Sequence, residues 1–199
     1  MAADGTEGAA PAAPGRERPR RSRTEPSGEE PAGHQGDDPD ADPVSVARAV
    51  ALRQLTMAPR SRAELEQKMA TKGVEREVAA QVLDRLTEVG LVDDEAYAGM
   101  LVRSRQVTRG LARRGLQQEL RSKGVDDDVA RAALAEVTDE DERATAEALV
   151  ARRLRVTRGL DRPVRERRLL GLLARKGYGG GVARAVVREA LDADDLTGA

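Results

Sequence analysis

The feature that most constrains this chain is an internal repeat. A Lys-Gly dipeptide recurs at Lys72-Gly73, Lys123-Gly124 and Lys176-Gly177, at intervals of 51 and 53 residues. A unit of that length is a single supersecondary motif, which buries little apolar surface alone, so neighbouring units must stack on one another. The sequence therefore predicts a tandem array of small units rather than one large core.

Apolar residues keep the same register around each dipeptide. Leucine or methionine stands seven and three residues before each lysine, which is the i, i+4 spacing of one helical face. After each glycine, five more apolar positions recur at fixed distances. The pattern predicts two helices that flank each dipeptide and face one core. The recurring residues are Leu65, Met69, Val78, Ala79, Val82, Leu83 and Leu86; Leu116, Leu120, Val129, Ala130, Ala133, Leu134 and Val137; and Leu169, Leu173, Val182, Ala183, Val186, Val187 and Ala190.

Local signals place the ends of these helices. Glycine readily adopts the left-handed conformation that closes a helix, and lysine in a last turn interacts favourably with the helix dipole. The next residue is expected to pack back onto that helix, as is Leu91 after Gly90. Polar residues that can accept backbone N–H groups should begin the following helices. The predicted caps are Ser61 with Glu64, Asp93 or Asp94, Asp126, Thr138 with Asp141, and Asp161 before Pro163.

A further helix is predicted ahead of each pair, at about 44–57, 94–107 and 139–156. The predicted fold is therefore all-α, with three tandem three-helix repeats stacked into an elongated, curved array. The repeats are expected at 44–92, 93–137 and 138–193, followed by a C-terminal tail at 194–199. With two tyrosines and no Phe or Trp, the core must be built mainly from aliphatic side chains.

Residues 1–43 differ from the rest in composition. They carry ten acids and five arginines, a net charge of −5, and almost no large apolar side chain. Such a segment cannot bury enough surface to offset the entropy of ordering it, so we expect a disordered acidic arm. The remaining residues hold 29 basic and 25 acidic side chains, a net charge of +4.

The composition argues against several kinds of enzyme. There is no cysteine, and the one histidine, His34, lies in the predicted arm. Thiol nucleophiles, zinc clusters and histidine-based acid–base pairs are thus unavailable, and we expect no catalytic residues, no cofactor and no metal. No apolar run approaches the roughly 20 residues that span a bilayer. Residues 1–14 also lack the features of a signal peptide. We expect a cytoplasmic, monomeric protein with no membrane contact.

One stretch resembles a known family. Gly90-Leu91-Val92-Asp93-Asp94-Glu95-Ala96-Tyr97-Ala98 is similar to the Gly-aromatic/aliphatic-Asp-Asp-x-x-Tyr-Ala signature of RecX proteins. The segments 60–65 and 72–74 resemble the first repeat of that family, and 119–125 resembles the second. The resemblance extends over about residues 45–191. It departs from the family at Leu91, where an aromatic residue is common, and the third repeat is the weakest match.

The resemblance implies a function that residue patterns alone do not give. RecX proteins are small bacterial proteins of tandem three-helix repeats that bind the RecA–DNA filament in its helical groove. They restrain the recombinase's ATPase, strand exchange and filament growth. This chain is therefore expected to be a non-catalytic inhibitor of RecA in recombination and DNA repair.

Two stretches between the first and second helices of a repeat contain arginines and no acid. Each includes Val-Thr-Arg-Gly-Leu, at 107–111 and 156–160, with four extra residues before Lys-Gly in the third repeat. Equivalent stretches on stacked repeats would form a positive stripe, either a solvated surface or a surface for an acidic or phosphate-bearing partner. The predicted basic stripe comprises Arg103, Arg105, Arg109, Arg113, Arg114, Arg152, Arg153, Arg155 and Arg158.

Other functions stay open at this point. Helical triplets with basic faces are also typical of helix-turn-helix proteins that bind DNA directly. The modest net charge and the lack of aromatic stacking residues argue against that function. A helical adaptor with another protein partner is a further alternative. A hydrolase that uses carboxylates alone is the least favoured.

Overall fold

The computed structural model describes residues 42–197, so the predicted acidic arm lies outside the described residues except for its last two. Those two already belong to the first helix. Asp42 is its N-cap, and the Asp42 carboxylate accepts hydrogen bonds from the backbone amides of Val44 and Ser45. Pro43 occupies the first turn, where a missing N–H costs nothing. The first helix therefore begins one residue earlier than predicted.

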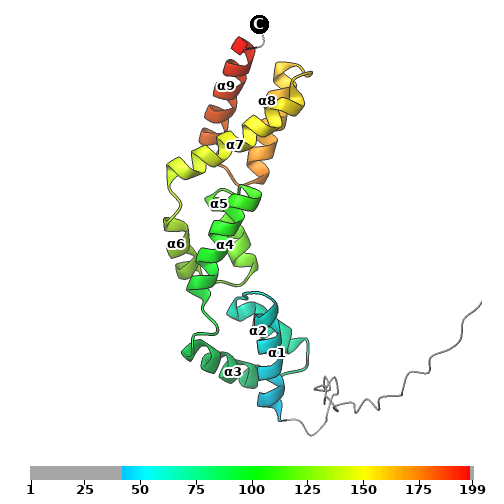
Figure 1. Ribbon diagram of the computed structural model, residues 1–199, viewed down its shortest axis with the longest axis vertical. Coiled ribbons are helices and arrows are strands. Elements are labelled where there is room, and N and C mark those ends of the chain that lie inside the picture. The colour runs from blue at the N-terminus through cyan, green and yellow to red at the C-terminus, as the bar shows by residue number, and fades with distance from the viewer. Residues whose placement is uncertain (1–41, 198–199) are drawn as a thin grey trace, which may run out of the picture. The chain divides into compact units, whose positions relative to one another are not determined.

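The described part of the chain is built from helices joined by short turns (Figure 1). No strand occurs in residues 42–197, so the all-α prediction is confirmed. Each predicted helix is present, with ends within about two residues of those expected. The helices are α1 (Pro43–Met57), α2 (Arg62–Ala70), α3 (Arg76–Glu88), α4 (Asp94–Arg109), α5 (Arg113–Ser122), α6 (Asp127–Ala135), α7 (Asp139–Thr157), α8 (Arg162–Arg175) and α9 (Gly180–Thr197).

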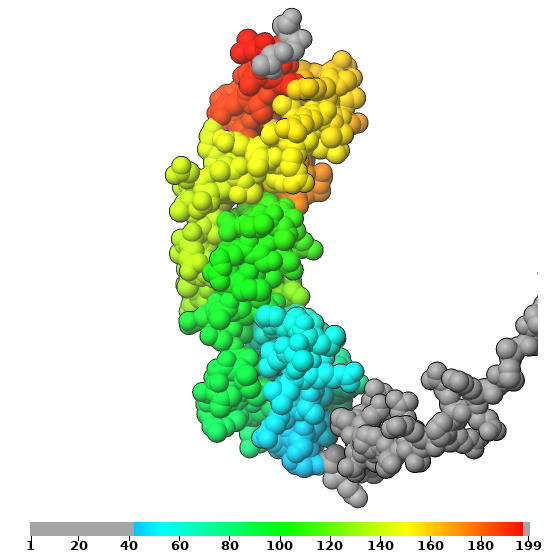
Figure 2. Space-filling view, in the orientation of Figure 1, coloured from blue at the N-terminus to red at the C-terminus, as the bar shows by residue number. Residues whose placement is uncertain are grey.

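Three apolar cores follow one another along the chain, each enclosed by three consecutive helices. Helices α1–α3, α4–α6 and α7–α9 therefore form three units, which occupy successive positions in Figure 2. The six leucine and methionine positions before the Lys-Gly dipeptides are at most 1% exposed. Val182 is the exception among the recurring positions, since 37% of it is exposed. The exact boundaries between repeats stay predictions.

Most predicted helix caps form as expected. Ser61 with Glu64 and Thr138 with Asp141 make reciprocal capping boxes at α2 and α7. Asp93 rather than Asp94 caps α4, and the prediction that Leu91 packs back was wrong. Leu91 is 53% exposed, and the next residue, Val92, is buried instead, although the amides of both residues donate to the Leu86 carbonyl.

Each Lys-Gly dipeptide closes a helix in the way the sequence predicts. The glycines have positive φ angles of 76° at Gly73, 69° at Gly124 and 90° at Gly177. The residue after each glycine donates its amide to a carbonyl in the preceding helix, over 3.2 Å for Val74 to Met69, and this hydrogen bond recurs in all three repeats. These bonds satisfy carbonyl groups that a helix end would otherwise leave unpaired.

The second of these turns also joins the first repeat to the second. The Lys123 carbonyl accepts the Ser61 hydroxyl over 2.5 Å, and the Lys123 ammonium contacts Glu64 over 2.8 Å. The side chain of Ala63 lies directly over Gly124. We call these contacts, between the start of α2 and Lys123-Gly124, the first joint.

The third turn joins the second repeat to the third in an equivalent way. The Lys176 carbonyl accepts the Ala112 amide over 3.0 Å, and Gly177 lies against the backbone of Gly115 at the start of α5. The Lys176 ammonium donates to the Arg109 carbonyl over 2.6 Å. Ser61 and Ala112 both stand eleven residues before the lysine of their own repeat. The second joint, formed by these contacts with the start of α5, therefore repeats the geometry of the first.

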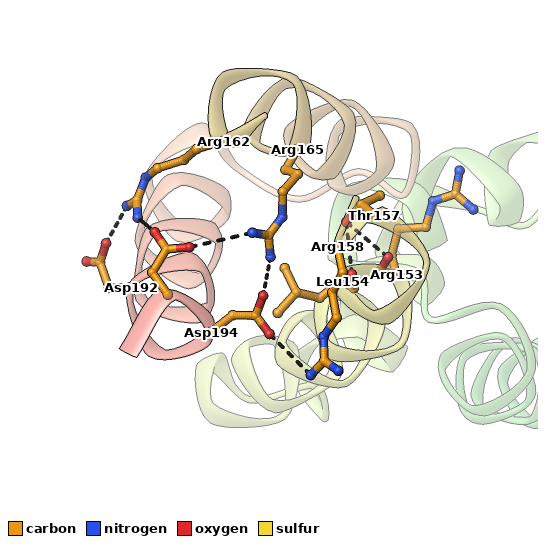
Figure 3. A network of polar contacts seen from close by, with 9 residues as sticks. Arg153, Leu154, Thr157, Arg158, Arg162, Arg165, Asp192 and Asp194 are labelled. Carbon is orange, nitrogen blue, oxygen red and sulfur yellow. Dashed lines mark hydrogen bonds and ion pairs between the residues drawn. The ribbon is translucent and has the colours of Figure 1, made fainter. Parts of the chain in front are cut away.

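The third repeat ends differently. Its extra residues lengthen the start of α8, and Arg165 occupies the position of Ser61 and Ala112. The buried Arg165 guanidinium pairs with Asp194 of α9, and Arg162 pairs with Asp192 and Asp195 (Figure 3). Helix α9 continues to Thr197, so residues 194–197 of the predicted tail are helical.

Because of the joints, replacing a turn glycine by alanine should lower the unfolding free energy by different amounts in the three repeats. Gly73→Ala meets no atom within 4 Å, so only the left-handed backbone is penalised, by about 1–2 kcal/mol. Gly124→Ala and Gly177→Ala incur the same penalty, and in addition the new methyl group overlaps Ala63 or the Gly115 backbone. Urea denaturation should show a larger loss of unfolding free energy for these two variants than for Gly73→Ala. Equal losses of unfolding free energy in all three variants would mean that the glycines do not contact the neighbouring repeat as described.

Candidate partner-binding surface

The predicted basic stripe lies where the first helix of a repeat gives way to the second. In the second repeat its members stand on α4 and the start of α5, and in the third repeat on α7 and at its end. Two groups of arginines therefore occur at structurally equivalent places. The structure divides the nine side chains by their contacts.

Five of these arginines pair with acids of the chain itself. Arg105 and Arg109 both contact Glu119 of α5, so they fasten α4 to α5. Arg113 contacts Asp139 and, over 3.0 Å, Glu142 of α7, which strengthens the second joint. The two remaining pairs are Arg103 with Glu136 at 3.7 Å and Arg158 with Asp194 at 3.4 Å. These five side chains therefore make ion pairs within the chain itself.

The other four arginines point outward. Arg114, Arg152, Arg153 and Arg155 are exposed, and none makes an ion pair with an acid in residues 42–197. They are the members of the stripe whose positive charge is available to a partner. The available surface is thus smaller than the sequence indicates, because a count of arginines does not reveal which acids of neighbouring helices reach them.

A small hollow lies at the second joint among positive groups. Its volume is about 160 Å³, and Arg109, Arg152 and Lys176 contribute to its lining, together with Thr145 and Leu149. The Lys176 ammonium is held there by the Arg109 carbonyl. An acidic group that enters this hollow would meet two or three cations.

Sequence reasoning missed a second group of arginines. Arg167, Arg168 and Arg175 of α8 line a hollow of about 590 Å³ together with Arg153 of α7. They escaped notice because Asp161 and Glu166 interrupt the sequence, and a search for stretches without acids stops there. The helical period of the sequence could have revealed these arginines, since positions 167, 168 and 175 lie off the buried face of α8.

The first joint also includes a polar network that the sequence did not predict. Tyr97 donates its hydroxyl to Glu64 over 3.0 Å, and Asp94 accepts the Arg62 amide over 2.8 Å. Burial acts to raise the pKa of Glu64, but hydrogen bonds from Lys123, Tyr97 and the Ser61 backbone outweigh it and hold that pKa below its ordinary value. Tyr97 is buried in the core of the second repeat, and its hydroxyl connects that repeat to the first.

A tyrosine at the second joint has an equivalent task. Tyr178 follows Gly177, is 6% exposed, and donates its hydroxyl to the Gly110 carbonyl over 3.2 Å. Burial, assisted by the negative charge of Glu142, raises the pKa of Tyr178 to about 12. The phenol therefore keeps its proton and donates this hydrogen bond throughout the neutral range.

Comparison with known families decides the relationship. The profiles of three RecX domains match this chain: the first three-helix domain over residues 47–86, the second over 93–134 and the third over 139–187. The chain belongs to the RecX family. Each matched segment falls within one of the three predicted repeats, including the third, where the sequence signature was weakest.

Relatives of similar length support the same relationship. The regulatory protein RecX of Streptomyces coelicolor is 50% identical over 155 residues, covering 78% of this chain and 82% of the relative. That of Thermobifida fusca is 51% identical over 150 residues, or 75% and 81% of the two chains. The crystal structure of RecX from Lactobacillus salivarius shares the fold, with a TM-score of 0.67 and 22% identity over 74% of this chain and 96% of that one.

Among residues 42–197, every helix is too short or too polar to span a lipid bilayer.

Adjacent arginines at the second joint provide a test of the division between structural and available side chains. Arg113→Glu places a carboxylate beside Glu142, whose side chain is only 12% exposed, and should lower the unfolding free energy by about 1–2 kcal/mol. Arg114→Glu changes an exposed, unpaired side chain and should stay within about 0.5 kcal/mol of the parent. Urea denaturation of both variants measures the difference. A larger loss for Arg114→Glu would mean that the division is wrong.

Proposed function

We propose that this protein is a non-catalytic inhibitor of a RecA recombinase in the cytoplasm. It binds in the groove of the RecA–DNA filament as a monomer and restrains ATP hydrolysis, strand exchange and filament growth. The observation that carries this proposal is the match of all three repeats to RecX domains, at an identity of about half with proteins named regulatory protein RecX.

The surface chemistry supports such a partner. A RecA–DNA filament offers both protein carboxylates and DNA phosphates, and the unpaired arginines of the second and third repeats suit either group. Joints that fix one repeat against the next would hold these arginines at defined spacing, so that little entropy is lost on binding a regular filament. A chain that contacts several filament subunits at once would also gain affinity from multivalency.

The direct test is the ATPase activity of the cognate RecA on single-stranded DNA. Sub-stoichiometric amounts of this protein should slow hydrolysis, because one bound molecule obstructs the growth of a whole filament. The double reversal Arg114→Glu/Arg152→Glu should weaken this inhibition by tenfold or more, equivalent to about 1.4 kcal/mol or more of binding free energy. These two side chains make no ion pair within the described residues, so the fold should persist, which circular dichroism checks.

A control variant separates this effect from net charge. Arg53→Glu/Arg184→Glu makes the same charge change at exposed arginines outside the basic stripe, and its inhibition should match that of the parent. Equal inhibition by both double variants would refute the role of the stripe and leave the inhibitor itself in place. A parent protein without effect on its cognate RecA at any ratio would refute the proposed function.

A further inference from the structure

We propose that the hollow between α7 and α8 binds the phosphodiester backbone of a nucleic acid through Arg153, Arg167, Arg168 and Arg175. This binding goes beyond the proposed inhibition of RecA, because it requires no recombinase. We call this hollow the four-arginine groove.

Four of the six residues that line the groove are arginines. Its volume is about 590 Å³, and Gly171 and Leu172 are the other residues that line it. No acid contributes to the lining, and none of its arginines pairs with an acid in the part of the chain that the structure describes. In Figure 3 the Arg153 side chain points away from the acids of α9. Four like charges around one hollow repel one another, and a bound anion would relieve that repulsion.

The arginines of α8 lie on two faces of the helix. Those on one face are paired with acids, whereas those on the face that lines the groove are not paired in the described part of the chain. On one face, Arg162 and Arg165 are neutralised by the acids at the end of α9. On the groove face, no acid within residues 42–197 compensates Arg167, Arg168 and Arg175. The ion pairs with α9 fix α8, and α8 in turn holds the uncompensated arginines in place.

The repeat itself shows why this face is open. Arg167 and Arg168 stand nine and eight residues before Lys176, the places that Ala63 and Glu64 hold before Lys72. In the first repeat both places lie in the first joint, and in the second repeat Gly115 lies in the second joint while Arg114 beside it is exposed. Among the described residues, no fourth repeat covers them in α8. The third repeat therefore exposes a surface equivalent to part of a joint, and this surface carries two arginines where the first repeat has alanine and glutamate.

The chemistry of the lining favours a phosphodiester backbone over an acidic protein. Protein interfaces depend on central aromatic or aliphatic contacts, and Leu172 is the sole large apolar residue of the groove. Guanidinium groups bind phosphate oxygens bidentately. Arg167 and Arg175 are eight residues apart on one helix, a rise of roughly 12 Å. This rise corresponds to between three and four axial steps of about 3.4 Å between successive phosphates of one strand.

The test uses the whole protein and a short mixed-sequence DNA duplex, without RecA. Fluorescence anisotropy should show binding that weakens steeply as salt rises from about 50 to about 200 mM. Arg167→Gln/Arg168→Gln should weaken binding at the lower salt concentration on the order of tenfold or more. It should also reduce the slope of log K against log salt by roughly 0.9 for each phosphate that the variant no longer neutralises. The second pair, Arg153→Gln/Arg175→Gln, should act in the same direction.

A charge-matched control removes two arginines elsewhere. Arg121→Gln/Arg131→Gln alters exposed residues of the second repeat outside the groove, and both the affinity and the salt slope should remain close to those of the parent. The proposal is overturned if the groove variants keep the parent's slope, or if control and groove variants lose affinity equally. It is also overturned if the parent binds polyglutamate through these arginines but does not bind DNA. RecA inhibition is measured separately, so failure of the groove leaves the proposed function standing.

Discussion

The Lys-Gly turn at the end of each second helix is the element on which the fold depends. A left-handed glycine closes its own helix, and in two of three cases it also gives the preceding repeat a flat surface to approach. The lysine adds two contacts at each joint, since its carbonyl accepts a hydrogen bond and its ammonium reaches across. A side chain at the glycine would separate the repeats. One dipeptide therefore ends a helix of its own repeat and holds the preceding repeat in place.

The position of a repeat determines what its equivalent residues do. In the first repeat, Lys72-Gly73 has no preceding repeat to contact within the described residues, and both residues are exposed. In the third repeat, the start of α8 contacts no further repeat within the described residues. It makes ion pairs with α9 instead, and other arginines of α8 face outward. Terminal repeats commonly differ from internal ones for this reason, because one face of each has no neighbour. The four-arginine groove lies where the pattern of the repeat is broken.

The sequence predicted the helices, most of their caps and the three cores, because each depends on local spacing; Asp161 begins α8 without a side-chain cap hydrogen bond. Leu65, Leu116 and Leu169 could be assigned to one buried position from their register alone. The joints could not be predicted, since they depend on how Ser61 or Ala112 meets a turn some sixty residues away. The same limit applies to the basic stripe. The partners of Arg105 and Arg113 are acids on other helices, and a sequence window does not reveal them.

The central claim is that this chain binds a RecA filament in preference to bare DNA. The most direct measurement compares its affinity for RecA assembled on single-stranded DNA with its affinity for the same DNA without RecA, at near-physiological salt. Non-specific contacts with phosphates are weak under those conditions, whereas contacts with the recombinase persist. The account predicts binding to the filament at least about tenfold tighter, equivalent to about 1.4 kcal/mol. Equal affinity for the filament and the bare DNA would contradict it.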